Sequence, residues 1–245
     1  GLEKTVSYGG GTKNGPKEII KASHQVELYD EELSCEPYKK IGIKTLKPFK
    51  IDKNINKALN KMSRINEEIL NNKFFPLTLG GEHSITPGCI APFAKKYKKL
   101  LLLHFDAHAD LRESYNGEKF SHASAIKRCL DYKNVSVISF GIRNISKSEI
   151  PYLKKNSSRI NIFWAKDKNK WNLNKFKKMI KNKNVYITFD VDGFDSSIMP
   201  ATGTPEPGGL FWYETLEIIK IAIKNSNIVG ADINELAPIK GFNSY

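Results

Sequence analysis

Residues 186–195, YITFDVDGFD, begin like a strand suited to the protein interior and then place acids close together. In an extended chain, side chains two residues apart point to the same face, so Asp190 and Asp192 bring two negative charges together at a strand end. Such a pair is repulsive and costly to bury unless it is compensated. We therefore expect a positive charge between these carboxylates.

A second stretch, FDAHAD, shows the same alternation of polar and small residues. Its three polar side chains share one direction if the backbone stays extended. His83 in GGEHS adds an imidazole, and the two stretches then supply a set of carboxylates and imidazoles that suits metal binding. The candidate metal ligands are His83, Asp106, His108, Asp110, Asp190 and Asp192.

The composition of this ligand set indicates which metal it suits. Carboxylate-rich sites favour Mg, Ca or Mn, and the imidazoles shift the preference towards Mn. A lone Zn²⁺ uses three or four ligands, often with Cys, so this set is too large for one such ion. Two divalent ions that share carboxylates would use the whole set, neutralise the acids and hold a shared water as hydroxide. His104 is expected to have a structural or supporting role instead.

Apolar runs alternate with amphipathic ones along the chain. Residues 51–71 carry apolar side chains at spacings of three and four, which predicts a helix. Further helices are predicted at 84–97, 121–131, 172–183 and 213–226. Strands are predicted at 73–81, 99–108, 134–142, 159–165, 184–192 and 227–236. This alternation indicates an α/β fold whose parallel sheet is covered on both faces, with functional groups beyond the carboxyl ends of the strands.

The composition excludes several function classes. The 245 residues carry a net charge of +13, but the cations are nearly all Lys in short scattered sets without a stacking motif, so we expect solvated helix faces and no nucleic-acid partner. The three cysteines show no CxxC spacing, which fits a reducing cytoplasm. No apolar run approaches the ~20 residues that a membrane span needs. We expect one domain over 1–245, shortened at both ends.

Five motifs, in this order, resemble the signatures of the ureohydrolase family, which contains the agmatinases, arginases and relatives. They are GGEHS (80–84), FDAHADLR (105–112), SHAS (121–124), FDVDGFDSSIMPATGTPEPGGL (189–210) and DINELAP (232–238). The resemblance implies a three-layer α/β/α fold around a parallel, mostly eight-stranded sheet, a binuclear Mn²⁺ centre, and a homo-oligomer that is a hexamer or a trimer.

The resemblance also implies how the ligands divide between the two ions. One ion would be bound by His83, Asp106, Asp110 and Asp190. The other would be bound by Asp106, His108, Asp190 and Asp192, so that Asp106 and Asp190 bridge the pair.

Catalytic roles follow from the same resemblance. Asp110 is similar to the residue that orients the metal-bridging hydroxide, His122 to the proton shuttle that protonates the departing amine, and Glu235 to the carboxylate that pairs with the substrate guanidinium. Two plainer interpretations stay open. Ser121 could cap a helix with His122 exposed in its first turn, and Glu235 could be a surface acid.

The motifs are most similar to those of agmatinases, which implies hydrolysis of agmatine, a small cationic guanidino compound, to putrescine and urea. Arginases carry an Asn in the loop after the position of Asp110 and an Asp after GIR, whereas Leu111, Arg112 and Asn144 stand here. Guanidinobutyrate, guanidinopropionate and arginine remain alternatives, and Arg112 could pair with a substrate carboxylate. The competing class is a basic binding module that needs no metal.

Overall fold

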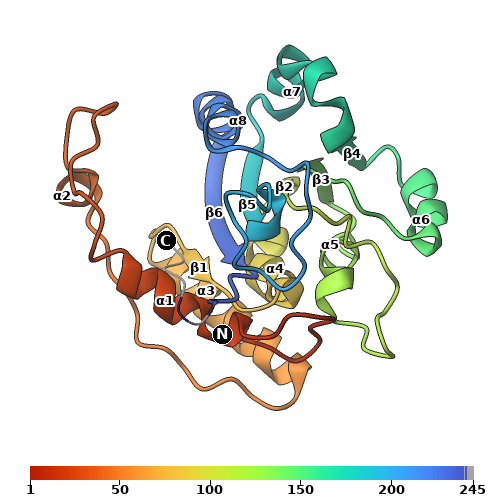
Figure 1. Ribbon diagram of the computed structural model, residues 1–245, viewed down its shortest axis with the longest axis horizontal. Coiled ribbons are helices and arrows are strands. Elements are labelled where there is room, and N and C mark those ends of the chain that lie inside the picture. The colour runs from red at the N-terminus through yellow and green to blue at the C-terminus, as the bar shows by residue number, and fades with distance from the viewer. Residues whose placement is uncertain (240, 242–245) are drawn as a thin grey trace.

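Six strands form one all-parallel sheet in the computed structural model, which describes residues 1–239 and 241 (Figure 1). The order across the sheet is β1-β6-β5-β2-β3-β4. The strands are β1 Leu77–Leu79, β2 Leu100–Phe105, β3 Val135–Phe140, β4 Ile160–Phe163, β5 Asn184–Asp190 and β6 Asn227–Asn234. Each lies within one of the apolar runs that predict a strand, so the α/β class with a parallel sheet is confirmed.

The expected number of strands is wrong. The resemblance implied a mostly eight-stranded sheet, whereas the described residues form a six-stranded one. The chain's own apolar runs number six, and each became a strand. The rest of the described chain forms helices or loops rich in Lys, Asn, Gly and Pro, which do not suit a buried parallel strand.

Helices cover both faces of the sheet, so the three-layer α/β/α arrangement is confirmed. The helices are α1 Gly15–Ala22, α2 Pro37–Ile41, α3 Ile55–Asn71, α4 Thr86–Lys96, α5 Ala125–Cys129, α6 Ile150–Lys155, α7 Leu173–Ile180 and α8 Trp212–Asn225. Short 3-10 helices are η1 Thr12–Asn14, η2 His83–Ile85, η3 His122–Ser124, η4 Lys147–Glu149, η5 Ala165–Lys170 and η6 Val191–Gly193.

The strand β2 shows how the sheet packs against one helical layer on each of its faces. Leu100 and Leu102 pack into a cluster with α3, α4 and α5, while Leu101 and Leu103 pack into a second cluster with α7 and α8 on the opposite face. All four leucines are buried, as expected for a central strand whose alternate side chains both meet helices. Figure 1 shows α7 and α8 on one side of the sheet and α3, α4 and α5 on the other.

The predicted helices exist, with adjusted ends. The amphipathic segment starts at Ile55, because the Asn54 side chain accepts a hydrogen bond from the Lys57 N–H and caps the helix. The segments predicted at 84–97 and 121–131 each begin as a 3-10 helix, η2 and η3, before α4 and α5. The helices α1, α2 and α6 were not predicted, since none of them has a long apolar repeat.

The strand register brings the functional strand ends together. Phe105 of β2 is level with Phe189 of β5, and Asp190 of β5 is level with Asn234 of β6. Leu79 of β1 is level with Ile233 of β6. Four neighbouring strands therefore deliver the loops that follow them to one edge of the sheet.

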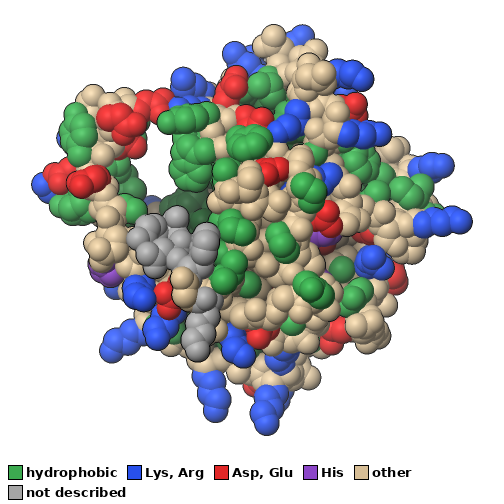
Figure 2. All heavy atoms as spheres, in the orientation of Figure 1, with side chains coloured by type: hydrophobic (Ala, Val, Ile, Leu, Met, Phe, Trp, Pro, Cys, Tyr) green, Lys and Arg blue, Asp and Glu red, His purple; other side chains and the backbone are tan. Residues whose placement is uncertain are grey.

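The segment between α1 and α3 stands apart from the layered body (Figure 1) and presents hydrophobic side chains to solvent (Figure 2). Its exposed large hydrophobic residues include Val26, Leu28, Tyr29, Leu33, Ile41, Ile43 and Leu46. Several exposed apolar side chains on one segment are typical of an interface. The homo-oligomer stays a prediction, which the solution mass of the protein tests.

Within the described residues, no helix has the length and apolarity needed to cross a membrane.

The N-terminal residues approach the start of η2 very closely. The Glu82 N–H donates to the Leu2 carbonyl at 2.8 Å, and Leu2 is fully buried. A Cβ placed on Gly81 would lie 2.0 Å from the Leu2 carbonyl oxygen, and one on Gly80 would lie 2.0 Å from the Asn234 side chain. Glycine at these positions therefore lets the backbone at residue 81 lie against that of Leu2, and the backbone at residue 80 lie against the Asn234 side chain of β6.

Replacing Gly81 with Ala should lower the free energy of unfolding by about 2 kcal/mol, since overpacking of this kind costs roughly 1–3 kcal/mol. Urea denaturation measures the change. Gly10→Ala is the matched control, because its nearest neighbour is the Glu3 carboxylate at 3.9 Å, and it should change stability by less than about 0.5 kcal/mol. Equal effects of the two substitutions would contradict the close approach at Gly81.

Candidate metal centre

His83 lies at the centre of the first group of candidate ligands. It begins η2, directly after the glycines that follow β1, and is fully buried. Three carboxylate oxygens surround its Nδ1 atom: Asp106 Oδ2 at 3.1 Å, Asp110 Oδ2 at 3.2 Å and Asp190 Oδ2 at 3.4 Å. The structure thus brings together the four residues that the resemblance implied for one ion.

His108 lies at the centre of the second group. Its Nδ1 atom is 3.0 Å from Asp192 Oδ2 and 3.5 Å from Asp106 Oδ1. The two oxygens of Asp106 therefore face different groups, one towards His83 and the other towards His108. Asp190 contacts His83 through Oδ2, while its Oδ1 accepts a hydrogen bond from the Asp192 N–H at 2.9 Å. Asp106 and Asp190 lie between the groups.

The backbone does not stay extended through the two acidic stretches. The strand β5 ends at Asp190, and Asp192 lies in η6. Past β2, Asp110 has a left-handed φ of 52°. The expected alternation along an extended strand is therefore wrong beyond the first acid of each stretch, although tight turns still bring the side chains together. Left-handed backbone at a residue other than glycine costs about 1–3 kcal/mol and tends to occur at functional sites.

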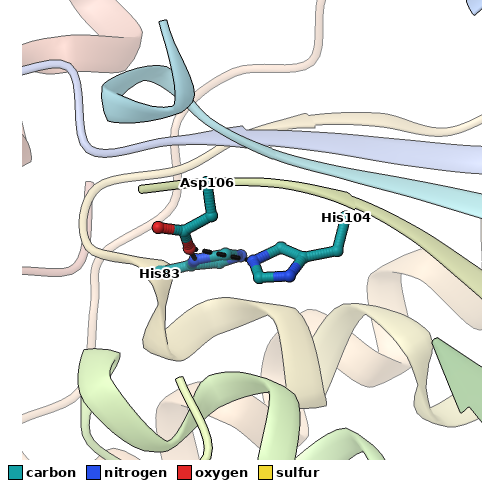
Figure 3. A group of neighbouring side chains, drawn as sticks. All are labelled: His83, His104 and Asp106. Carbon is teal, nitrogen blue, oxygen red and sulfur yellow. Dashed lines mark hydrogen bonds and ion pairs between the residues drawn. The ribbon is translucent and has the colours of Figure 1, made fainter. Parts of the chain in front are cut away.

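His104 also belongs to this cluster. It lies on β2, is fully buried, and its Nε2 atom is 2.9 Å from Asp106 Oδ2, while Nδ1 is 3.0 Å from the Ser139 hydroxyl. Figure 3 shows His83 and His104 converging on the same oxygen of Asp106. One ligand atom from each of these three residues lies within 4.8 Å of the others. These three residues, and separately Asp106, His108 and Asp192, are groups that could hold a metal ion.

A buried network that the sequence interpretation missed holds His83 from behind. The Nε2 atom of His83 is 2.8 Å from the Thr188 hydroxyl, which donates to Asp232 Oδ1 at 2.7 Å. The Thr86 hydroxyl and the Asn234 amide donate to the same oxygen. Thr188 could have been found from its place two residues before Asp190 on the same strand. Partners of this kind fix the orientation of a ligating histidine.

Burial and mutual repulsion control the protonation of the acids. Burial, followed by the charge of Asp106, raises the pKa of Asp110 to about 7. Burial and the charge of Asp192 raise the pKa of Asp190 well above its usual value. Burial alone would lower the pKa of His108, but hydrogen bonds to Asp106 and Asp192 raise it to about 12. Positive charge therefore stabilises these buried carboxylates, and protons or metal cations can supply it.

A cavity of about 200 Å³ opens onto the two groups, and its lining includes His122 and Glu235. Glu235 is buried, has a left-handed φ of 65°, and accepts a hydrogen bond from the His83 N–H at 2.7 Å, so it is not a surface acid. His122 is half-buried in η3, and Ser121 does not cap that helix, because its hydroxyl bonds to the Ser124 hydroxyl instead. The structure therefore places His122 and Glu235, like Asp110, in the lining of the cavity beside the candidate ligands.

Polar side chains from other segments also line the cavity. Arg112 lines it, and its guanidinium lies 5.6 Å from the centre of the Tyr115 ring. Asn144 also lines it and donates to the Glu206 carboxylate at 2.8 Å. Glu149 lines it too, but its carboxylate already accepts the Leu111 and Ser146 N–H groups.

Arg143 was missed as a residue that builds the site. Its guanidinium donates to the backbone carbonyls of Asp192, Phe194 and Glu206 at 2.7, 3.1 and 2.7 Å, which ties the end of the β5 loop to the GTPEP segment. These contacts join segments up to 63 residues apart, so no local pattern reveals them.

Comparison with known proteins agrees with this architecture. The profile of the Arginase family matches residues 1–244. The chain is 34% identical over 249 residues to an N(1)-aminopropylagmatine ureohydrolase of Synechocystis sp., with 98% of this chain and 80% of that protein covered. It is 37% identical over 244 residues to an agmatinase of Bacillus anthracis, with 97% of this chain and 81% of that protein covered.

Solved structures agree as well. The crystal structure of an agmatine ureohydrolase of Thermoplasma volcanium has a TM-score of 0.86 at 28% identity, with 98% of this chain and 80% of that chain covered. The shared sheet and the match along nearly the whole chain show that this protein belongs to the arginase family, as an agmatinase-like ureohydrolase.

Proposed function

We propose that the two groups of side chains hold two Mn²⁺ ions, with Asp106 and Asp190 as shared ligands. The donor chemistry fits, because carboxylates and imidazoles in this proportion suit Mn²⁺. The burial of the acids supports the proposal further, since burial raises the pKa values of Asp110 and Asp190, and bound cations would offset the cost of ionising these two carboxylates. When bound, such an ion pair supplies an activated water as the nucleophile.

The chain's own residues supply the rest of the reaction. A guanidinium carbon is a poor electrophile and its leaving amine is strongly basic, so hydrolysis needs an oriented nucleophile and a proton donor. Glu235 binds the substrate guanidinium, since a carboxylate matches that planar fork and one of its oxygens is already fixed by the His83 N–H. Asp110 orients the attacking water through a hydrogen bond, and His122 protonates the departing amine.

We propose that the substrate is agmatine, which is hydrolysed to putrescine and urea. The convergence of both ligand groups, His122 and Glu235 on one cavity supports hydrolysis of a guanidino compound, and the agmatinase names among the relatives favour agmatine. The names of the relatives support the guanidino class, and the longer substrate in the name of the Synechocystis relative makes N(1)-aminopropylagmatine a natural second compound to test.

A guanidino acid is the second candidate substrate, because Arg112 lines the same cavity. Its guanidinium rests against the Tyr115 ring and could pair with a substrate carboxylate such as that of guanidinobutyrate. Agmatine offers an amine at that end, which Arg112 would repel. The preference between the two compounds therefore reports on the role of Arg112.

Urea release tests the proposed function. We expect the Mn²⁺-loaded protein to release urea from agmatine faster than from guanidinobutyrate, guanidinopropionate or arginine, and to lose the activity on chelation. Asp192→Asn should lower kcat more than about a hundredfold, because a ligand to an ion that provides several kcal/mol of transition-state stabilisation is weakened. Asp131→Asn, an exposed acid outside the site, is the matched control and should stay within about twofold.

Each contrary outcome has a distinct meaning. Full Mn²⁺-dependent activity in Asp192→Asn would contradict the ligand assignment. A preference for guanidinobutyrate that Arg112→Ala abolishes would keep the mechanism and replace the substrate. Absence of urea from every compound, together with salt-dependent nucleic-acid binding that survives chelation, would favour the basic binding module instead.

Binding of Mn²⁺ to the metal-free protein should strengthen as pH rises from about 6 to about 8. Asp110 has its pKa raised to about 7 and His108 to about 12, so both carry protons that a metal ion must displace. The increase should be steeper below about pH 7, where Asp110 is protonated as well as His108. Competition against a fluorescent chelator at several pH values measures the affinity. A pH-independent affinity would contradict metal binding at these residues.

A further inference from the structure

The N-terminal segment, residues 1–9, reaches into the site from the opposite end of the chain. Val6, Ser7, Tyr8 and Gly9 line the same cavity as His122 and Glu235. At the far end of the segment, the Gly9 N–H donates a hydrogen bond to the Gly203 carbonyl at 3.1 Å. This segment is therefore one wall of the candidate active site.

Glu82 anchors this wall. Its side chain is fully buried, and Oε2 accepts hydrogen bonds from the backbone N–H groups of Lys4 at 2.8 Å and Thr5 at 2.7 Å. The Ser84 hydroxyl donates to its other oxygen at 2.6 Å. A carboxylate that accepts several hydrogen bonds is strongly held. Since Glu82 directly precedes His83, the position of Thr5 is tied to the candidate metal centre.

The Thr5 hydroxyl makes two contacts with one residue, His122. It accepts a hydrogen bond from the His122 backbone N–H at 3.0 Å and lies 3.0 Å from the Nδ1 atom of the same residue. It thereby takes the place of a helix cap for η3, which Ser121 does not supply. The Tyr115 ring meets the His122 ring edge-on at 5.3 Å between centroids and limits its rotation from another side.

The role of His122 as a proton donor fixes the roles in this contact. The cationic ring that donates carries protons on both nitrogens, so its Nδ1–H donates to the Thr5 oxygen, whose other lone pair accepts from the backbone N–H. Loss of the Nε2 proton then leaves a neutral ring that keeps its proton on Nδ1.

We propose that Thr5, held by Glu82, is a positioning residue for His122: its hydroxyl oxygen accepts the Nδ1 proton, which fixes the orientation of the imidazole and leaves Nε2 as the atom that donates. This inference rests on the proposed function of His122 as the proton donor to the departing amine. After that donation, Nε2 is the atom that must be reprotonated, and Thr5 keeps Nδ1 occupied so that protons move through the other nitrogen only.

The pKa of His122 provides a measurement that does not depend on activity. Burial lowers this pKa, Glu82 and Asp106 raise it, and His108 and His83 lower it. Thr5→Val keeps all of these groups and removes only the hydroxyl. Because a hydrogen bond from Nδ1–H to the Thr5 oxygen is stronger for the cationic ring than for the neutral one, its loss should lower the pKa of His122 by roughly half a unit to one unit.

The experiment measures deuterium exchange at the imidazole C2 position by mass spectrometry as a function of pH, which gives the pKa of His122 in the Mn²⁺-loaded protein. We expect the lowered pKa in Thr5→Val and in the smaller Thr5→Ala, and a value near that of the unsubstituted protein in Thr5→Ser. Thr12→Val is the matched control, because its buried hydroxyl in the same part of the chain bonds to Glu3 instead. An unchanged or raised pKa in Thr5→Val and Thr5→Ala would overturn the proposed hydrogen bond from Nδ1 to Thr5.

Kinetics test the catalytic consequence. Thr5→Val should lower kcat about tenfold, a part of the 10²–10⁴-fold that a positioned acid supplies, with KM within about twofold and with Thr5→Ser restoring most of the loss. A shifted pKa with unchanged kcat would overturn the positioning role. If the unsubstituted protein releases no urea at all, the proposed function fails, while the exchange measurement still decides the contact between Thr5 and His122.

Discussion

Four carboxylates gathered at one edge of a parallel sheet are the constraint on which the rest of this structure depends. Asp106, Asp110, Asp190 and Asp192 are all buried, and ionised acids at such separations repel one another strongly. Burial, together with the charges of Asp106 and Asp192, raises the pKa values of Asp110 and Asp190, as expected for such repulsion. In the proposed metal centre, cations between the acids would remove this repulsion and would make a bound water reactive.

The fold meets the constraint by fixing each acid from outside the cluster. The sheet register sets the ends of β2 and β5 side by side. Arg143 binds three carbonyls of the loop after β5, and the Thr188–Asp232 network holds His83 from behind. Left-handed backbone conformations at Asp110 and Glu235 direct these two carboxylates into the site, which a regular helix or strand would not do. Rigid supports of this kind suit a site whose ligands must keep their positions as charge changes.

The sequence predicted those features that depend on neighbours along the chain. The apolar runs located all six strands, and the periodicity of α3 located the longest helix, because burial on one or both faces leaves a regular mark. Acids and histidines after apolar runs located the edge where the site lies, since parallel strands share their carboxyl ends. The division of the ligands and the catalytic roles came from the resemblance and could not have come from spacing.

Features built by distant contacts were not predictable from one sequence. Thr5 and His122 are separated by 117 positions, and Arg143 acts through backbone carbonyls that any residue type provides. The turns at Asp110 and Asp192 depart from an extended strand, because tertiary contacts override local preference there. The short helices α1, α2 and α6 have too few apolar positions to be seen as a repeat.

Anomalous X-ray diffraction from crystals of the Mn²⁺-loaded protein tests the central claim most directly. The account predicts two manganese peaks about 3.5–4 Å apart. One should be bound by His83, the other by His108, with Asp106 and Asp190 contacting both. A single peak would contradict the account, and so would a pair in which His104 is a ligand or in which Asp190 contacts only one ion.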